Sequence, residues 1–233
     1  MTVRGVIFDM DGVLVDSGAH HRAAWSALLA ELGATASAPE LWRITIGRPA
    51  HEAVALLLDR VLSDEEAMQL ASRKRELYRV FARRGAVAVP GAPAFVGSVA
   101  RTGTACAVAT SASREDARHV LDALGLADRF GAVVTAEDVS RGKPDPEVYL
   151  RAARAIGVAP PACLVFEDAV VGVKAARDAG MRVIGVTTAH SGDELSAAGA
   201  ECAIAHFEGL TWPIGLALPR TGAVSADLRR RET

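Results

Sequence analysis

The sequence has few cysteines, few aromatic residues and no excess of either charge. Its 233 residues include three cysteines and 5% aromatic residues, and the 26 lysines and arginines nearly balance the 28 acidic residues. Because a net charge of −2 leaves no general basic surface, we do not expect a nucleic-acid partner. No run approaches the ~18 uninterrupted apolar residues that a membrane-spanning helix needs, so we do not expect a membrane partner either.

The three cysteines are isolated from one another along the chain. Cys106, Cys163 and Cys202 each lie in an apolar, strand-like run. Their number is odd, their spacings fit no zinc pattern, and none has a partner nearby in the sequence. We interpret them as buried, reduced thiols of a cytoplasmic protein. The first residues agree with this, because they lack a charged region followed by a long apolar stretch, as in a signal peptide.

The later part of the chain alternates short apolar runs with amphipathic stretches. Half of all residues are apolar, which at this length allows a sizeable core. Strands that alternate with helices predict an α/β fold with a doubly wound parallel sheet and right-handed connections. The apolar runs span residues 6–8, 104–109, 132–135, 163–166, 182–186 and 201–205.

Residues 17–85 interrupt this alternation with a run of predicted helices. Apolar residues recur at helical spacing over residues 20–32 and 51–61. Ser63 and Glu66 form the capping-box pattern, which predicts that a third helix begins there. Since no strand is predicted between these helices, they form a block of their own after the first strand.

This pattern predicts how the chain divides into domains. Residues 1–16 and 86–218 would form a Rossmann-like α/β core around the parallel sheet. Residues 17–85 would form an α-helical domain that is inserted into this core. Residues 219–233 are polar and rich in arginine, so we expect them to form a flexible tail.

Two aspartates, Asp9 and Asp11, stand at the end of the first predicted strand. Because side chains alternate along a strand, the two carboxylates share a face if the extended geometry continues. Gly12 then allows the chain to turn sharply away from the sheet. Taken alone, Asp-x-Asp-Gly is also typical of a solvated turn, so the interpretation depends on the other strand ends.

Polar residues also follow three later strands. Thr110 and Ser111 come after the second predicted strand, residues 142–146 read Gly-Lys-Pro-Asp-Pro in the loop after the third, and Glu167 and Asp168 end the fourth. The carboxyl ends of parallel strands lie at one edge of a sheet, so we expect these groups and the two aspartates to converge there.

Four carboxylates and a lysine at one sheet edge indicate a site for a cation and an anion together. Clustered carboxylates repel one another unless a cation joins them, and an all-oxygen ligand set favours Mg²⁺. Lys143 adds a positive charge, and the Thr110 hydroxyl with neighbouring N–H groups can donate to an anion. This combination suits phosphoryl transfer, in which charge on the phosphoryl oxygens must be compensated.

This chain resembles the haloacid dehalogenase-like superfamily in four motifs, which occur in the family's order and spacing. They are Asp9-Met10-Asp11-Gly12-Val13, the strand that ends at Thr110, Gly142-Lys143-Pro144-Asp145-Pro146, and Val165-Phe166-Glu167-Asp168. The resemblance is to the branch that contains phosphatases and β-phosphoglucomutase, which carries a helical cap after the first motif. Asp11 marks the members that transfer phosphoryl groups, so a dehalogenase is not expected.

The resemblance implies catalytic roles for both aspartates of the first motif. Asp9 would attack phosphorus and form an aspartyl-phosphate, a form of covalent catalysis. Asp11 would protonate the leaving oxygen and then deprotonate the water that hydrolyses the intermediate. Mg²⁺ would be held by the Asp9 carboxylate, the Asp11 backbone carbonyl and Asp168, with Glu167 a direct or water-mediated ligand.

The resemblance also implies which residues bind the phosphoryl group. Thr110 and Lys143 would hold it, and Ser111 would contribute its backbone N–H. We assign the hydroxyl role to Thr110, and Ser111 remains the alternative for it.

Four residues of the predicted cap are candidates for substrate selection. By resemblance to β-phosphoglucomutase, His21 and Trp25 occupy positions that line the cleft, and Gly47 and Arg48 lie on a cap loop. Trp25 fits the apolar core of the cap equally well. A guanidinium suits a phosphate or a polyol. Ile46 stands where the mutases have a cap lysine, which counts against a mutase unless Arg48 substitutes for that lysine.

Other polar residues near these motifs are interpreted structurally. Asp145 lies between two prolines, where a turn or helix-cap role is favoured over a ligand role. Glu137 and Asp138 are expected in a solvated loop. Residues 113–115 are expected to cap the helix that follows them.

We therefore expect a Mg²⁺-dependent phosphatase that hydrolyses a small phosphate monoester through an aspartyl-phosphate. The substrate would be a small phosphorylated metabolite, either sugar-phosphate-like or like a nucleotide or C-glycoside phosphate. Two alternatives remain open, a hexose-phosphate mutase of the β-phosphoglucomutase type and a non-catalytic phosphate-binding module. A monomer is the favoured oligomeric state.

Overall fold

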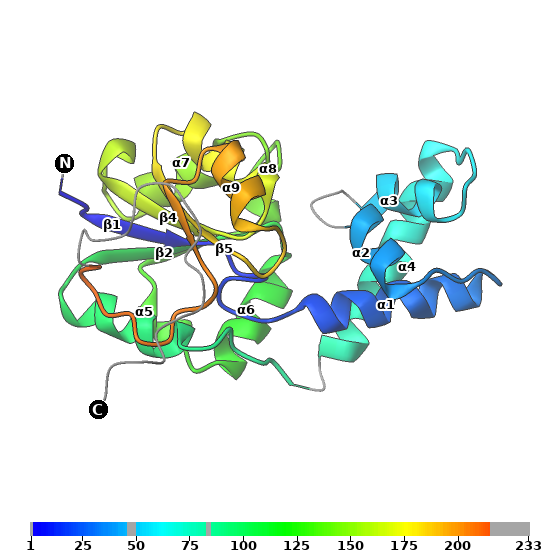
Figure 1. Cartoon of the computed structure of the whole chain (residues 1–233), viewed down its shortest axis with the longest axis horizontal. Helices are drawn as coiled ribbons and strands as arrows, with labels where there is room; N and C mark the ends of the chain where they lie inside the picture. Colours follow the sequence, from blue (N-terminus) through cyan, green and yellow to red (C-terminus); the bar gives the residue numbers. More distant parts are fainter. Residues whose placement is uncertain (1, 46–49, 83–84, 215–233) are drawn as a thin grey trace, which may run out of the picture.

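A computed structural model describes residues 2–45, 50–82 and 85–214 of the chain. Figure 1 shows two parts, a sheet covered by helices and a separate group of helices beside it. We call residues 2–16 and 85–214 the core, and residues 17–82 the helical unit. The predicted tail at 219–233 lies outside the described residues.

A six-stranded parallel sheet forms the centre of the core, within the residues described. The strand order is β3-β2-β1-β4-β5-β6, so the chain winds outward in both directions from β1. This confirms the predicted α/β fold. The strands are β1 (Gly5–Phe8), β2 (Ala105–Ala109), β3 (Ala132–Val134), β4 (Cys163–Glu167), β5 (Arg182–Val186) and β6 (Cys202–Ile204).

The first strand, β1, is central because its residues are apolar and covered on both sides. It pairs in parallel with β2 and with β4, and Val6, Ile7 and Phe8 are completely buried. A run without polar alternation is typical of a parallel strand with helices on both faces of the sheet. The carboxyl end of β1 points toward the helical unit in Figure 1, so the polar residues that follow β1 lie at the junction of the two parts.

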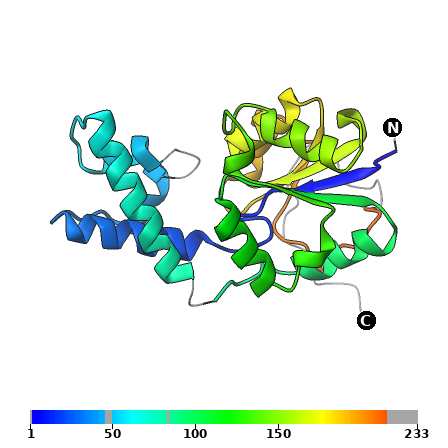
Figure 2. The ribbon, with the colours of Figure 1, turned by 180° about the vertical axis from the view of Figure 1, so that it is seen from behind.

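Helices cover both faces of the sheet. The helices α5 (Ala92–Arg101) and α6 (Arg114–Ala123) pack on one face, and α7 (Glu147–Ala155), α8 (Val170–Asp178) and α9 (Gly192–Ala198) pack on the other. Figure 2 shows this arrangement from behind. Three short 3-10 helices, η1 (Ala127–Arg129), η2 (Ala136–Asp138) and η3 (Pro160–Ala162), lie in the connections.

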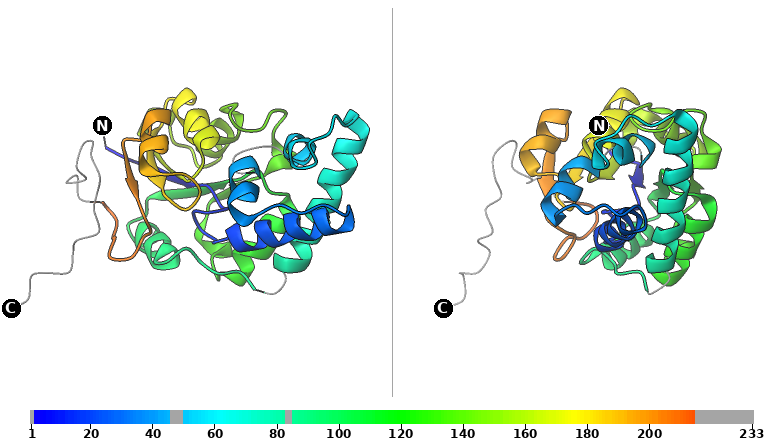
Figure 3. Two further views of the ribbon diagram at one scale, coloured as in Figure 1. Left: turned by 45° about the vertical axis from the view of Figure 1, so that its right-hand side comes forward. Right: turned by 90° about the vertical axis from the view of Figure 1, so that its right-hand side faces the viewer.

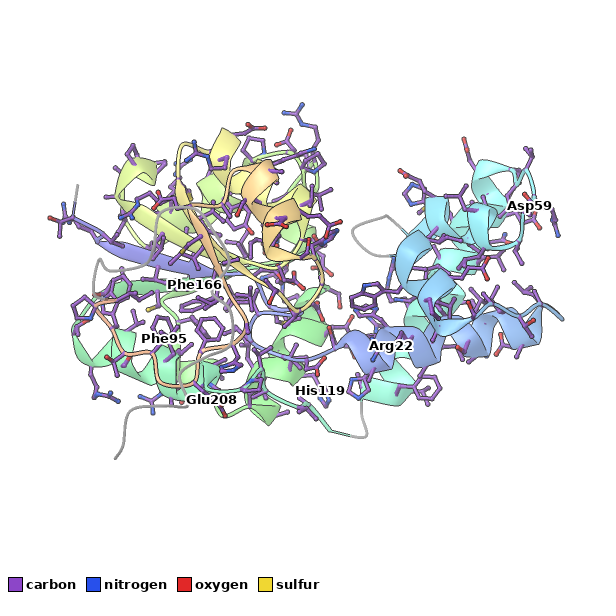
Figure 4. The ribbon with its side chains drawn as sticks, in the orientation of Figure 1. Arg22, Asp59, Phe95, His119, Phe166 and Glu208 are labelled. Atoms are coloured by element: carbon purple, nitrogen blue, oxygen red, sulfur yellow. The ribbon has the colours of Figure 1, made fainter. Side chains whose placement is uncertain are left out.

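Four of the six phenylalanines pack together under α5. Phe8 and Phe166 stack with ring centroids 5.2 Å apart, and Phe95 meets the ring of Phe166 edge-on at 5.3 Å. Phe207 packs against both Phe95 and Phe166. Figure 4 labels Phe95 and Phe166 within this cluster. These four rings therefore fill one region of the core, where α5 meets the sheet.

The helical unit contains four helices in the part that the structure describes: α1 (Gly18–Glu31), α2 (Ala38–Thr45), α3 (Ala50–Leu57) and α4 (Asp64–Ala82). Its own small core includes Trp25, Leu28 and Leu41. At the start of α4, the Glu66 N–H donates to Ser63 Oγ at 3.2 Å as predicted. The Glu66 carboxylate instead pairs with Arg60 at 2.6 Å, so the other half of the capping box is replaced by an ion pair.

Two neighbouring chain segments join the helical unit to the core. The Asp16 N–H donates to the Val87 carbonyl at 2.7 Å, and the Val89 N–H donates to the Leu14 carbonyl at 3.1 Å. Val15 and Ala88 form an antiparallel bridge between these bonds. The helical unit is thus an insertion whose two ends lie side by side, at the edge of the core seen in Figure 3.

The cysteines occupy strands of the sheet and are all free thiols. Cys106 and Cys163 are buried as predicted, whereas Cys202 is partly exposed because β6 is an edge strand. Among the described helices, none combines the length and the apolar character that crossing a bilayer requires.

Candidate active site

Asp9, Lys143 and Glu167 form a buried charged cluster at the carboxyl edge of the sheet. The Lys143 Nζ donates to Asp9 Oδ1 and to Glu167 Oε1, both at 2.6 Å. The side chain of Lys143 is 7% exposed and that of Glu167 is 1% exposed. Residues separated by more than a hundred positions therefore meet because β1 and β4 are neighbours and the loop after β3 crosses this edge.

The cluster carries more negative charge than Lys143 neutralises. Burial raises the pKa of Asp9 to about 7. The charges of Glu167 and Asp11 also raise this pKa, whereas the charge of Lys143 lowers it. Burial also holds the pKa of Asp168 well above its ordinary value, reinforced by the charges of Glu167 and Asp9. Two buried carboxyl groups with raised pKa values at one place are typical of a functional site.

Asp168 is held by the loop that follows β5. Its Oδ2 lies 3.1 Å from Thr188 Oγ1, and that hydroxyl also lies 2.6 Å from the carbonyl of Gly12, to which it donates. The backbone carbonyl of Asp168 lies 3.1 Å from His190 Nδ1. A Cβ at Gly12 would overlap the Asp168 carboxylate, so the glycine allows this close approach. The sequence analysis missed Thr188 and His190, although their position after a strand of the same sheet was a usable signal.

Glu167 is bonded to donors on every side. Its Oε1 accepts from the Tyr149 hydroxyl at 3.0 Å as well as from Lys143, and its Oε2 accepts from the Ala169 N–H at 2.7 Å. The carboxylate lies against Gly172 of α8, where a Cβ would overlap it. Glu167 is therefore better placed to orient Lys143 than to offer a free oxygen to a metal ion.

The oxygen donors of this edge fit Mg²⁺ with few protein ligands. Among the residues that the structure describes, no three His, Cys, Asp or Glu side chains form a ready-made metal cage. The carboxylates of Asp9 and Asp168 remain as donors, and both have raised pKa values that a bound cation would reverse. Mg²⁺ commonly uses one or two protein carboxylates and completes its shell with waters and substrate phosphate.

Asp11 lies where the core meets the helical unit. Its side chain is 32% exposed, the Tyr78 hydroxyl donates to its Oδ1 at 3.3 Å, and His21 Nε2 lies 3.8 Å from the same oxygen. Burial would raise the pKa of Asp11, but hydrogen bonds from His21 and Ser17 outweigh it and hold the pKa below its ordinary value. The resting Asp11 is therefore a carboxylate that accepts hydrogen bonds.

Lys74 of α4 organises the residues of the helical unit that face Asp11. It is 8% exposed, and its Nζ lies 2.6 Å from His21 Nδ1 and about equally close to the rings of Trp25 (5.4 Å) and Tyr78 (5.3 Å). The His21 and Tyr78 rings stack at 4.3 Å. Burial lowers the pKa of Lys74 to about 8. Burial together with the charge of Lys74 also lowers the pKa of His21.

Of the predicted cap residues, two are described and two are not. His21 lies beside Asp11, and Trp25 belongs to the core of the helical unit with its ring turned to Lys74. Gly47 and Arg48 lie outside the described residues. The sequence analysis missed Lys74 and Tyr78, although their spacing of four places them on one face of the predicted helix.

The segment after β2 supplies hydroxyl groups at the same edge. Thr110 is 1% exposed, and its Oγ1 accepts from the Ala112 N–H at 3.0 Å. Accepting this bond leaves the hydroxyl hydrogen of Thr110 available for an anion. Ser111 is exposed. Ser113 caps α6 by accepting from the Asp116 N–H at 3.1 Å, as expected.

The structure confirms the predicted role of one further acidic residue, Asp145, and contradicts that of another, Asp138. Asp145 Oδ1 accepts from the Glu147 N–H at 3.0 Å at the start of α7, as its predicted helix-cap role requires. The expectation of a solvated loop is wrong for Asp138. Its Oδ2 accepts from the N–H and hydroxyl of buried Thr135, because a buried threonine needs partners for both groups.

Comparisons with known proteins show what the chain is similar to. The family model of haloacid dehalogenase-like hydrolases matches residues 3–180. The chain is 35% identical to validoxylamine A 7'-phosphate phosphatase of Streptomyces hygroscopicus subsp. limoneus, over 89% of this chain and 95% of that protein. It is 33% identical to fructose-1-phosphate phosphatase YqaB of Escherichia coli, over 78% of this chain and 95% of the relative.

Solved structures show the same fold. A β-phosphoglucomutase from Clostridium difficile superposes with a TM-score of 0.76 at 26% identity, covering 91% of this chain and 94% of the other. A hydrolase of the same broad family from Entamoeba histolytica superposes with a TM-score of 0.81 at 26% identity, covering 91% of this chain and 96% of the other.

Proposed function

This chain belongs to the haloacid dehalogenase-like hydrolase family, and from that premise we propose that it hydrolyses small phosphate monoesters. The observation that carries the proposal is the buried Asp9–Lys143 pair at the sheet edge, with Asp11 two residues away at the junction with the helical unit. A nucleophilic carboxylate, a cation beside it and a second carboxylate facing outward are the parts that stepwise phosphoryl transfer requires.

We propose that Asp9 attacks the phosphorus atom of the ester. The new bond joins a carboxylate oxygen to phosphorus, while the bond from phosphorus to the ester oxygen breaks and the electron pair leaves with that oxygen. Water then attacks the phosphorus of the aspartyl-phosphate, which releases inorganic phosphate and restores Asp9. The contact with Lys143 fixes the direction of the Asp9 carboxylate before the ester arrives.

Asp11 would move the protons for both steps. It would donate a proton to the leaving oxygen and then accept one from the attacking water. Because the pKa of Asp11 is held below its ordinary value in the resting structure, binding of the ester must raise this pKa before Asp11 can act as an acid.

Lys143, the Thr110 hydroxyl and the Ser111 N–H would bind the phosphoryl oxygens. Lys143 contributes charge, and Thr110 contributes its hydroxyl hydrogen, for which the described residues show no acceptor. Mg²⁺ would be held by the carboxylates of Asp9 and Asp168 and by the backbone carbonyl of Asp11. When bound, the ion supplies positive charge that offsets the negative phosphoryl oxygens.

We further propose that the helical unit acts as a cap that selects the substrate, as the division into a core (1–16 and 86–218) and an insertion (17–85) implies. His21 lies beside Asp11, and the ring of Trp25 lies 5.4 Å from the Lys74 Nζ. Relatives of this chain are named as phosphatases of fructose 1-phosphate, of hexitols and of validoxylamine A 7'-phosphate. A phosphorylated polyol or sugar is therefore the substrate class that we propose.

The test is release of inorganic phosphate from a panel of sugar phosphates, hexitol phosphates, nucleotides and p-nitrophenyl phosphate, with Mg²⁺ and with a chelator. Mg²⁺-dependent release from polyhydroxylated esters, in preference to nucleotides, is the expected result. No release from any ester would contradict the proposal.

A hexose-phosphate mutase is the second candidate, supported by the likeness to the C. difficile β-phosphoglucomutase. It predicts isomer formation from β-glucose 1-phosphate that needs a bisphosphate primer. Conversion without net phosphate release would favour the mutase over the phosphatase.

A further inference from the structure

Arg79, near the end of α4, connects the helical unit to α6 of the core. Its Nε donates to Asp116 Oδ1 at 2.9 Å, and its Nη2 donates to Ser113 Oγ at 3.3 Å and lies 3.5 Å from Glu115 Oε2. Figure 1 shows α6 on the side of the core nearest to α1 and α4. This contact joins the two parts of the molecule, in addition to the chain crossings near Val15 and Ala88 and the contacts of Tyr78 and His21 with Asp11.

The core residues that bind Arg79 lie next to the proposed phosphate-binding segment in the sequence. Ser113 Oγ donates to Asp116 Oδ2 at 2.6 Å and caps α6, and it stands three residues after Thr110. Asp116 is only 16% exposed, so its carboxylate is partly withdrawn from water. The guanidinium thus binds the end of the same turn that presents the Thr110 hydroxyl.

On the helical unit, a direct sequence neighbour of Arg79 contacts Asp11. Tyr78, the residue before Arg79, donates to Asp11 at 3.3 Å and stacks on His21. The Tyr78 bond is longer than the Arg79–Asp116 bond and involves an uncharged donor, so it is the weaker of the two. Adjacent residues on α4 therefore contact the two functional segments of the core, and the ion pair is the firmer attachment.

The charges around Arg79 favour this attachment specifically. Asp116, Glu115 and Glu137 all act on the guanidinium from the core. Arg114, which precedes Glu115 in the sequence, pairs with Asp138 at 2.6 Å. Arg79 therefore faces an acidic surface of the core.

We propose that Arg79 is a positioning residue that sets the orientation of the helical unit on the core, and so holds Tyr78 and His21 against Asp11. The proposal rests on the proposed function, in which Asp11 needs a defined environment to move protons. Without the ion pair, the helical unit would turn more freely about the segments at 14–16 and 87–89, and the arrangement in which Tyr78 and His21 contact Asp11 would be populated less.

Three variants test this role. Arg79→Met keeps the aliphatic part of the side chain and removes the charge, and Arg79→Lys restores a charge without the fork of donors. Arg73→Met is the matched control, because Arg73 lies on the same helix and pairs with Glu31 and Glu76 inside the helical unit. A general effect of removing an arginine from α4 would appear in both Met variants.

The measurements are amide hydrogen exchange and steady-state kinetics on p-nitrophenyl phosphate. In Arg79→Met we expect exchange at the end of α4 and at residues 85–89 to rise about threefold to tenfold, and kcat/KM to fall by a similar factor. Arg79→Lys should recover part of both changes. Arg73→Met should leave kcat/KM and the exchange of residues 85–89 unchanged.

Two outcomes would overturn the proposal. One is exchange in Arg79→Met that matches Arg73→Met at residues 85–89, which would show that the ion pair does not fix the helical unit. The other is raised exchange with unchanged kcat/KM, which would show that orientation does not matter to the reaction. If the unaltered protein releases no phosphate, the proposed function fails, and the exchange data still decide whether Arg79 holds the helical unit.

Discussion

At the scale of single residues, the resting charge balance of the site depends on Lys143. One ammonium group contacts two carboxylates, Asp9 and Glu167, and a third carboxylate, Asp168, lies within their field. Tyr149 shapes this balance as well, because its ring lies 4.9 Å from the Lys143 Nζ and its hydroxyl bonds to Glu167. The site is built to hold the carboxylates of Asp9 and Glu167 in place around one ammonium group.

Replacing the nucleophile tests this arrangement. Asp9→Asn should lower phosphate release by on the order of a thousandfold or more, because the amide cannot attack phosphorus as the carboxylate does. The fold should persist, since burial already disfavours the charged form of Asp9. Phosphate release and the thermal midpoint would be measured side by side, with Asp145→Asn as a control outside the cluster. Retained release in Asp9→Asn, with contaminating phosphatase excluded, would contradict covalent catalysis.

The sequence predicted the charged cluster more readily than its surroundings. Asp9, Lys143, Glu167 and Asp168 follow apolar runs or lie in loops beyond them, and the parallel topology brings such positions together. Lys74 could not be assigned in this way, because its contact with His21 depends on how α4 packs across α1 (Figure 2). Helix packing joins residues that no local pattern connects.

At the scale of elements, the start of α8 determines where Glu167 can lie. Gly172 lies in the first turn of that helix, and the Glu167 carboxylate occupies the space where a Cβ would be. Strand β4 and helix α8 therefore approach each other through a glycine, and the approach leaves Glu167 within reach of Lys143.

Adding one methyl group at this point should disturb the site. Gly172→Ala should displace Glu167, lower phosphate release at least about tenfold and cost about 1–3 kcal/mol of unfolding free energy, as overpacking does. Gly97→Ala in α5 is the matched control, because its Cβ would meet only Arg101 at 3.6 Å. That control should be neutral or stabilising by about 0.5–1 kcal/mol in urea unfolding. Equal effects of the two substitutions would refute the role of Gly172.

Elements with a clear apolar pattern were predicted, and two short helices were not. The strands follow from apolar runs, and α6 and α7 are each followed closely by a glycine with positive φ, Gly125 and Gly157. Helix α9 was missed because it has only seven residues. Its signal was the capping box in which Ser191 accepts from the Glu194 N–H and Glu194 accepts from the Ser191 N–H. Helix α2 was missed because only two of its residues, Leu41 and Ile44, are buried apolar side chains.

At the scale of the whole molecule, the raised pKa values link stability to pH and to the cation. Burial raises the pKa of Asp9 from 3.8 to about 7 and also raises that of Asp168. The folded chain then holds these protons more tightly than the unfolded chain does. The contribution of the two groups to stability is therefore greatest below about pH 4 and is lost as the pH rises toward 7.

A divalent cation should reverse this loss. Because Mg²⁺ binds the deprotonated carboxylates, it should raise the thermal midpoint more at about pH 8 than at about pH 5. Melting curves with Mg²⁺ and with chelator at both pH values measure this difference. In Asp168→Asn the Mg²⁺-dependent increase should disappear. A shift that is equal at both pH values, or that survives in Asp168→Asn, would exclude these carboxylates as the cation site.

The way in which the helical unit joins the core has a consequence for how such enzymes diversify. The Asp16 N–H and the Val87 carbonyl are hydrogen-bonded at 2.7 Å, so the two ends of the insertion already meet. A short turn can close that gap, or a different set of helices can fill it, with β1 and its aspartates left in place. With the proposed role of the helical unit as a cap, substrate preference would be exchangeable as one genetic segment, separately from the residues that perform the chemistry.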